Sequence, residues 1–461
     1  MSRRHSEIFK KKPATCMQQV PCFSMSVACV VAILTAFTTT SEVLGQNLIF
    51  ERAPINYHET EVFDPVSKLA AKVVSGEIKL QHEADFGYLK SLLKALDIPV
   101  SSQTLVFSKT SLQLHRISPR NPRSLYFNDD VYVGYCQNGD ELELAATDPT
   151  QGAIFYTLSQ QQQQQEKPSF IRDRGNCLTC HATGRTQNVP GYLMRSVFPD
   201  RSGQPRYGRG TMLTDSTSSF KERWGGWYVT GTHGDMRHMG NSICSDDTTP
   251  FDRETGANCN TLNQFIRTER FLSAHSDIVA LMVLQHQSQM HNAIASANYE
   301  TRQAIYQAEQ MNELLERAAD HLSETAERRI NSAADRVVKH LLMCDEFTLT
   351  DQVTGSSEFT KEFEAVGKQD SRGRSLREFD LQTRVFRYPC SYLIHSDAFD
   401  GLPDLVRTKI LEKLVNVLTL RDTGQEYQHL SPDMRRDILE ILRDTKPEFR
   451  KVEKSISITN R

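Results

Sequence analysis

The spacing of apolar residues predicts an α+β segment in the first third of the chain. In residues 85–98 apolar side chains recur every three or four positions, which predicts a short amphipathic helix. Asn138-Gly139 lies between two strand-like runs and indicates a hairpin turn. The runs rich in β-branched and aromatic residues, which predict strands, are 103–107, 124–127, 131–135, 141–145 and 153–158.

The second third of the chain has little regular spacing. A run of glutamines at 160–165 is typical of a surface-loop insertion. Gly, Pro, Arg and aromatic residues are dense from there to about residue 260. Long loops of this composition hold their shape by wrapping a ligand or another part of the protein.

The last part of the chain is predicted to be mainly helical. No Gly or Pro occurs between Gly256 and Gly355, which predicts two or three helices, and Ser276-Asp277 is a helix start. Helical spacing returns at 405–418 and 433–442, while the polar segment 367–378 is expected in a surface loop. The predicted fold class is therefore α+β.

Residues 1–45 predict a secretory signal peptide. Basic residues precede an apolar run at 27–37, and small and polar residues follow up to Gly45. The run has about eleven residues, against roughly 20 for a helix that spans a bilayer. We therefore expect cleavage, export to the periplasm or cell exterior, and no stable membrane span. Cleavage would change the net charge from −3 to −6, and an acidic chain of this kind is not expected to bind nucleic acid.

Cys177-Leu178-Thr179-Cys180-His181 is a CxxCH sequence, the attachment site of haem c. Two thiols at this spacing can add to the two vinyl groups of one porphyrin, and His181 then lies under the iron. We expect one covalent haem on Cys177 and Cys180, with His181 as the proximal ligand. The alternatives are a structural metal site completed by Cys244 or Cys259 and a thioredoxin-type disulfide, although no strand-helix pattern of that fold surrounds the motif.

The organisation that follows has four parts: a signal peptide at 1–45, an α+β domain at 46–159, a cytochrome c haem-binding region at 160–260 and a mainly helical domain at 261–461.

The sequence leaves the distal iron ligand open. The candidates after the motif are Met194, Met212, Met236, Met239, His233 and His238. We favour Met239, with His233 and His238 as alternatives, because the segment 224–241 holds both tryptophans and glycines that allow close approach to a flat ligand. An open sixth position is the remaining possibility.

Five arginines close to these segments can pair with haem propionates or with carboxylates of the protein: Arg172, Arg174, Arg185, Arg195 and Arg237. His286 and Met290 share a helix face with Val279, Val283 and Ala293, and His291 lies beside it. Such a stripe is more typical of a core than of iron ligation.

Five cysteines lie outside the leader and the motif: Cys136, Cys244, Cys259, Cys344 and Cys390. In an oxidising compartment they allow at most two disulfides, with Cys244 and Cys259 the pair closest in sequence. The alternative is that all five are buried thiols that pack as small apolar residues. The sequence does not choose between the two.

Four stretches of the chain carry a resemblance to a known group: LYFNDDVYVG at 125–134, CLTCH at 177–181, ERWGGWYVTGTHG at 222–234 and RYPCSYLI at 387–394. With these stretches the chain resembles an uncharacterised group of exported single-haem cytochrome c domain proteins of planctomycete-type bacteria. The resemblance implies haem binding and electron transfer and indicates no substrate.

The leading functional hypothesis is electron transfer outside the cytoplasm, with a redox partner protein of unknown identity. The alternative is a haem enzyme of peroxidase type or a small-gas sensor, with an open iron face and His233 or His238 acting on the bound ligand. A third hypothesis is a docking protein whose helical region binds a partner cytochrome.

Overall fold

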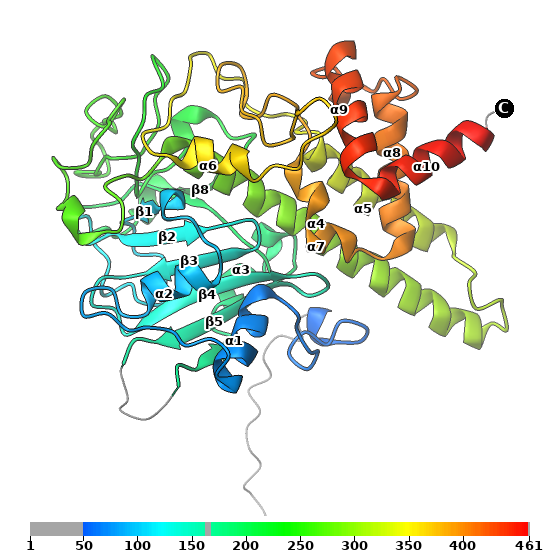
Figure 1. Ribbon diagram of the computed structural model, residues 1–461, viewed down its shortest axis with the longest axis horizontal. Coiled ribbons are helices and arrows are strands. Elements are labelled where there is room, and N and C mark those ends of the chain that lie inside the picture. The colour runs from blue at the N-terminus through cyan, green and yellow to red at the C-terminus, as the bar shows by residue number, and fades with distance from the viewer. Residues whose placement is uncertain (1–48, 162–166, 460–461) are drawn as a thin grey trace, which may run out of the picture. The chain divides into compact units, whose positions relative to one another are not determined.

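The computed structural model describes residues 49–161 and 167–459 (Figure 1). The expected signal peptide lies outside these residues, as does most of the glutamine run. Residues 49–461 form one compact unit.

The centre of this unit is an antiparallel seven-stranded sheet with the strand order β6-β5-β4-β3-β2-β1-β9. Its strands are β1 (Thr104–Val106), β2 (Arg123–Phe127), β3 (Val131–Tyr135), β4 (Glu141–Asp148), β5 (Gly152–Ser159), β6 (Phe170–Arg172) and β9 (Trp227–Tyr228). The five predicted strands and the turn at Asn138-Gly139 are confirmed, since Asn138 has a φ of 55° and the Gly139 N–H donates to Cys136 O at 2.9 Å.

The sequence missed the two edge strands β6 and β9. Each is only two or three residues long, which is too short for an alternating pattern to stand out. The loop-rich region after β6 also holds a separate two-stranded sheet, formed by β7 (Arg195–Val197) and β8 (Thr211–Leu213).

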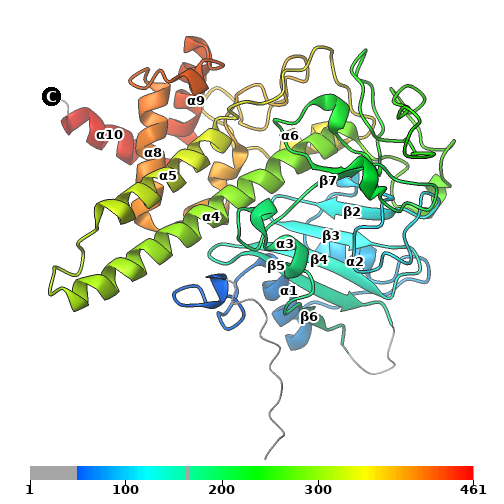
Figure 2. The same cartoon turned by 180° about the vertical axis from the view of Figure 1, so that it is seen from behind.

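The two faces of the large sheet are covered differently. Helices α1 (Pro65–Ser75) and α2 (Leu89–Ala95) lie on one face, and the short helix α3 (Leu178–His181) lies on the other (Figures 1 and 2). Helix α2 is the helix predicted at 85–98. The face with α3 is the one on which the candidate site forms.

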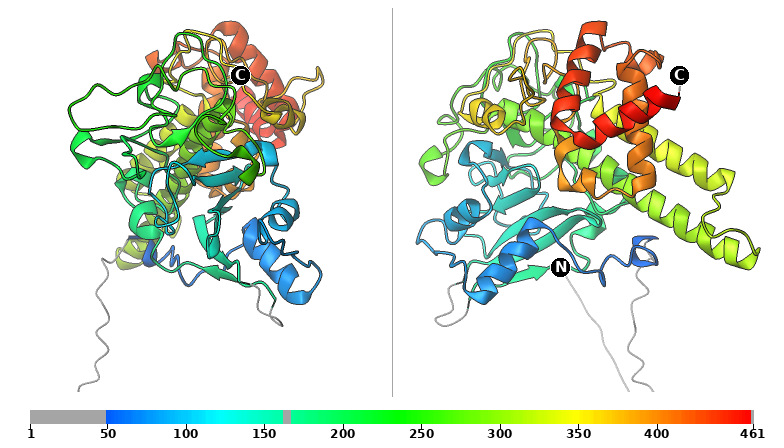
Figure 3. Two further views of the ribbon diagram at one scale, coloured as in Figure 1. Left: turned by 90° about the vertical axis from the view of Figure 1, so that its left-hand side faces the viewer. Right: turned by 45° about the vertical axis from the view of Figure 1, so that its right-hand side comes forward.

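The C-terminal part of the chain is helical, as predicted. The helices are α4 (Ile278–Leu314), α5 (Glu324–Leu341), α6 (Phe359–Ala365), α7 (Asp397–Asp400), α8 (Asp404–Leu418), α9 (Pro432–Thr445) and α10 (Pro447–Thr459). Asp277 is confirmed as the N-cap of α4, because its carboxylate accepts the Val279 N–H at 2.8 Å. Helices α4 and α5 pack against each other and extend together away from the sheet (Figure 3).

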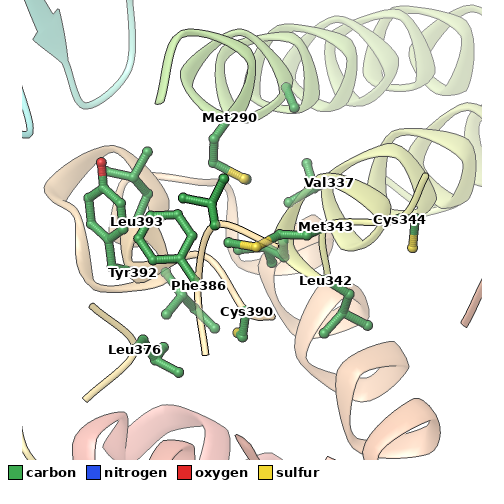
Figure 4. Close-up of a cluster of buried hydrophobic side chains, with 14 of the residues drawn as sticks. Met290, Val337, Leu342, Met343, Cys344, Leu376, Phe386, Cys390, Tyr392 and Leu393 are labelled. Atoms are coloured by element: carbon green, nitrogen blue, oxygen red, sulfur yellow. The ribbon is translucent and has the colours of Figure 1, made fainter. Parts of the chain in front are cut away.

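Helix α4 joins the sheet to the helical region, and both therefore belong to the same compact unit. Its first half is almost entirely buried. On one side, Gln287 donates to the backbone oxygens of Asn128 and Asp129 at the β2–β3 turn. On another side, Met290 points into an apolar cluster with Met343, Phe386 and Leu393 (Figure 4).

All seven cysteines of the described part of the chain are free thiols. Cys136, Cys244, Cys344 and Cys390 are buried. Cys244 Sγ and Cys259 Sγ point to different backbone oxygens, those of Asp246 and Gly256. The structure therefore has free thiols rather than a disulfide between these two, and the alternative of five buried thiols holds for four of them, since Cys259 is only partly buried.

Among the described residues, no helix combines the length and the apolar character needed to cross a bilayer.

Candidate cofactor-binding site

Residues 177–181, called the motif turn below, are fixed against the edge of the sheet by one carboxylate. Asp173 Oδ2 accepts the backbone N–H groups of Gly175 and Cys177 at 3.0 and 2.9 Å, and the Asp173 N–H donates to Phe155 O in β5 at 2.8 Å. The His181 N–H donates to Cys177 O at 2.9 Å and closes the turn. The local hydrogen bonds thus place both thiols and the imidazole on one short helical turn.

The motif turn covers a cavity of about 390 Å³, which we call the motif cavity. This volume lies in the range of small-molecule and cofactor sites, roughly 300–1,000 Å³. The sheet supplies one wall, and α4 contributes Leu284 and Ser288. The side chains of the motif turn that line it are Cys177, Cys180 and His181.

His181 is held with one ring nitrogen bound to protein and the other available. The Nδ1–H donates to the Gly191 backbone oxygen at 2.9 Å, and the ring lies 4.9 Å from that of Phe155. Among the described residues, His181 Nε2 has no hydrogen-bond partner. Burial lowers the pKa of His181, which favours the neutral imidazole that metal ligation requires.

Helix α4 positions the carbonyl that orients His181. Asn292 accepts the Tyr192 N–H at 2.8 Å and donates to Tyr192 O at 2.7 Å, next to Gly191. A Cβ on Gly191 would lie 2.2 Å from Asn292 Oδ1, so this close approach requires glycine. The orientation of the imidazole therefore depends on a side chain more than one hundred positions away in the sequence.

The two thiols of the motif turn differ in exposure. Cys177 is half-buried and Cys180 is exposed. Burial, followed by the nearby Asp173 carboxylate, raises the pKa of Cys177 to about 12. Both sulfur-bearing side chains nevertheless line the motif cavity, together with His181.

Two arginines with unused donors line the cavity. Arg123 pairs with Glu143 at 2.7 Å across the sheet face, while the buried Nε atoms of Arg123 and Arg195 have no hydrogen-bond partner among the described residues. The sequence named Arg195 but missed Arg123, which shares a sheet face with Leu125 by simple alternation.

Two of the other named arginines are engaged elsewhere: Arg172 donates to Tyr57 O and Arg237 pairs with Glu254. The arginines that do not line the cavity are Arg172, Arg174, Arg185 and Arg237.

The structure does not bring the favoured distal ligand to the cavity. Met239 is buried with its Sδ 3.7 Å from Ser196 Oγ, and it does not line the motif cavity. Met194, which the sequence offered among the methionines after the motif, does line it and is only 3% exposed. Among the described residues, no other methionine lines this cavity.

His233 and His238, called the histidine pair below, are also outside the motif cavity. Their rings lie 4.7 Å apart, and Phe220 packs against both. His233 Nε2 accepts the Asn258 N–H and His238 Nδ1 accepts the Gly240 N–H, each at 3.0 Å. The lone pair of each neutral ring is thus used by the backbone and is not available to a metal. His233 Nδ1 is buried without a hydrogen-bond partner among the described residues.

The stripe on α4 is part of the core, as the sequence favoured. His286 is buried, and its Nε2 lies 2.8 Å from Ser391 Oγ. His291 Nε2 donates to Asp129 O at 2.7 Å. Neither histidine lines the motif cavity.

The donor groups of the motif cavity can be compared with what a cofactor would need. Two thiols and one orientable imidazole on the same turn are what a covalently attached haem requires. Cys244 and Cys259, the fourth ligands considered for a structural metal site, do not line the cavity. In the part of the chain that the structure describes, no group of three or more His, Cys, Asp or Glu side chains is placed to hold a metal ion.

Comparison with known proteins adds no assignment: no protein-family model, no curated protein and no solved structure matches this chain.

Proposed function

We propose that this chain is a c-type cytochrome that carries one covalent haem and transfers electrons outside the cytoplasm. The observation that carries the proposal is the convergence of Cys177, Cys180 and His181 on one cavity of cofactor size. When bound, the haem iron would accept and release one electron as it changes between the ferric and ferrous states.

The surrounding residues support this assignment by their chemistry. His181 is held by the Gly191 carbonyl, the usual kind of partner for the second nitrogen of a metal-bound imidazole. Arg123 and Arg195 offer charged donors to the carboxylates of a porphyrin. Leu112 and Leu114 line the cavity while being 46% and 49% exposed, and a flat apolar group in the cavity would cover them.

Met194 replaces Met239 as our candidate for the distal ligand. It lines the cavity and is nearly fully buried. A His–Met pair would give a six-coordinate iron with a higher reduction potential than a bis-histidine site. That arrangement suits an electron carrier.

The second candidate function is a haem protein with an open distal face, such as a small-gas sensor. The observation that favours it is that His181 is the only histidine among the residues lining the motif cavity. A peroxidase-type mechanism that uses His233 or His238 on the bound ligand has less support, because neither side chain lines the cavity.

The covalent haem is tested by expressing the full chain in a host that attaches haem c and staining a denaturing gel for haem. We expect staining of the wild-type chain and none in the Cys177→Ala/Cys180→Ala variant. The matched control is Cys244→Ala/Cys259→Ala, which removes two thiols from outside the cavity and should stain normally. Staining of the first variant would refute the proposal.

Carbon monoxide separates the two candidate functions. In a six-coordinate carrier, reduced wild-type protein should bind carbon monoxide slowly, and the Met194→Leu variant should bind it rapidly. Rapid binding by the wild type, unchanged by Met194→Leu, would support the open-face alternative instead.

A further inference from the structure

A second cavity lies in the helical part of the molecule and is rich in cationic groups. It has a volume of about 130 Å³ and lies between the loop before Tyr392 and the turn that joins β2 and β3. The polar residues that line it are Asp129, Lys368, Ser375, Arg377, Tyr392 and His395. We call it the Arg377 pocket.

The sequence predicted the segment 367–378 to be a surface loop. The backbone does run in turns there, but Ser375 and Arg377 are buried, with exposures of 4% and 8%. A buried arginine is unusual unless it is paired or serves a ligand. The burial of these polar residues therefore requires an explanation.

The guanidinium of Arg377 is fixed in a defined plane. Its central carbon lies 4.5 Å from the ring centre of Phe363 and 4.3 Å from that of Tyr392. Asp129 accepts a hydrogen bond from one of its terminal nitrogens. Because a guanidinium has five N–H donors in a rigid fork, several remain for a ligand in the pocket.

His395 lines the same pocket and lacks protein partners. Both of its ring nitrogens are buried and neither has a hydrogen-bond partner among the described residues. Burial and the positive charges of Lys368, Lys446 and Arg377 lower the pKa of His395 to about 3. Leaving a buried polar group unsatisfied is unfavourable, so a molecule in the pocket that accepts the His395 N–H would be stabilised.

The charged side chains around the pocket do not all neutralise one another. Asp129 neutralises Arg377, and Asp400 pairs with Lys446, but among the described residues Lys368 makes no ion pair. Lys368 is exposed and can approach from the rim of the pocket. Asp130 also lies near Arg377, but burial raises its pKa to about 7 and weakens its charge. Among the described groups that line the pocket, Lys368 therefore supplies a positive charge that no carboxylate neutralises.

We propose that the Arg377 pocket binds a small oxyanion of the phosphate class, held by Arg377, His395 and Lys368. The volume admits a group of this size and lies well below the roughly 300 Å³ at which drug-sized ligand pockets begin. Nucleotides and other large phosphate esters are thereby excluded as fully enclosed ligands. This inference does not depend on the haem proposal.

The pocket is joined to the motif cavity by hydrogen bonds. The Tyr392 hydroxyl donates to Gln287 Oε1 at 2.7 Å, and Gln287 Nε2 donates to the hydroxyl of Tyr132, which lines the motif cavity, at 2.8 Å. An anion that orders Arg377 and Tyr392 should thus also stabilise α4. A ligand that binds only the folded state raises its stability by mass action.

The test is titration of the full chain with inorganic phosphate at constant ionic strength, followed by calorimetry and by NMR of the His395 ring. We expect a Kd of about 1 mM or tighter. The bound anion should raise the pKa of His395 by about one unit or more, because an adjacent negative charge favours the imidazolium. Thermal unfolding should move to higher temperature as phosphate is added.

Variants distinguish a built site from general attraction to positive charge. Lys368→Ala and His395→Gln should each weaken binding about tenfold, or 1.4 kcal/mol. Lys361→Ala is the matched control: this lysine is 84% exposed and pairs with Glu358, and binding should not change. Because Lys368 is exposed, its removal tests the site without unfolding the core.

The proposal is overturned if phosphate produces no heat and no change in the His395 titration. It is also overturned if Lys361→Ala weakens binding as much as Lys368→Ala does, since that result indicates non-specific attraction.

Discussion

The motif turn and the histidine pair contain the most conspicuous histidines of the sequence, but their ring nitrogens face different surroundings. His181 donates from Nδ1 to a carbonyl and keeps Nε2 available in a cavity. His233 and His238 each accept a backbone N–H and pack against each other and Phe220. A histidine available as a ligand therefore donates its N–H to the backbone and keeps its lone pair, whereas each packed histidine uses its lone pair to accept a backbone N–H. The composition of the segment does not show this difference.

The largest expected effect comes from removing the imidazole of the motif turn. In the haem-loaded protein, His181→Gly should abolish the low-spin absorption bands, because the iron loses its proximal ligand while the thioethers keep the haem attached. Added imidazole should restore the bands. His238→Gln is the matched change in the histidine pair and should leave the spectrum unchanged. Loss of the bands in His238→Gln but not in His181→Gly would mean that the histidine pair, and not His181, supplies the iron ligand.

The second effect is acid destabilisation. Burial lowers the pKa of His286 to about 3 and that of His291 to about 4, and it lowers the pKa of His238 as well. The unfolded chain binds these protons at a pKa of about 6.5. The contribution of each histidine is therefore complete above pH 6.5 and is lost as the pH falls toward its folded-state pKa, by about 1.4 kcal/mol per pH unit.

Urea unfolding at pH 7.5, 6 and 5 measures this loss. In His238→Gln, the free energy of unfolding should depend on pH less steeply, by the contribution of one proton. An unchanged slope in this variant would mean that the histidine pair is not held neutral by the fold.

The third effect concerns the scaffold of the motif turn. Asn292→Ala leaves the buried N–H and C=O of Tyr192 without their partner, at a cost of about 2–4 kcal/mol in the free energy of unfolding. It should also broaden the ¹H NMR signals of haem-bound His181, because the Gly191 carbonyl is no longer fixed. Asn298→Ala, also buried in α4 but bound to Gly401 O, should destabilise the fold without that spectral change.

The smallest effect is expected at the methionine that the sequence favoured. Met239→Leu conserves volume in a packed site and should cost less than about 1.5 kcal/mol, with no change in the haem spectrum. Met194→Leu should change the spectrum, because Met194 lines the motif cavity. A spectral change in the Met239 variant would restore Met239 as the candidate for the distal iron ligand.

Local patterns predicted the elements of this fold well. Runs of β-branched and aromatic residues identified β1 to β5. The Asn138-Gly139 turn, the Asp277 cap and the long helical region follow from residue chemistry that acts over a few positions. The edge strands β6 and β9 were missed because their pairing is decided by partners rather than by their own residues.

The candidate site could be predicted only in part. The motif turn is a local feature and carries its own signal, whereas the cavity walls come from distant segments. Arg123 and Met194 gain their positions from sheet register and from β7, and Asn292 from the packing of α4. A single sequence holds no record of which distant segments meet, so Met239 was favoured over Met194 because its segment is rich in Trp, Gly and His.

The origin of the walls of the motif cavity limits how recombination can transfer the site to another protein. They come from the loop at 110–114, from strands β2 to β5, from the motif turn and the residues after it, and from α4. The motif turn therefore does not form the site on its own. A gene fragment that encodes residues 160–260 would supply the thiols and the imidazole but not most of the cavity walls. Recombination can transfer this chemistry only together with nearly the whole compact unit.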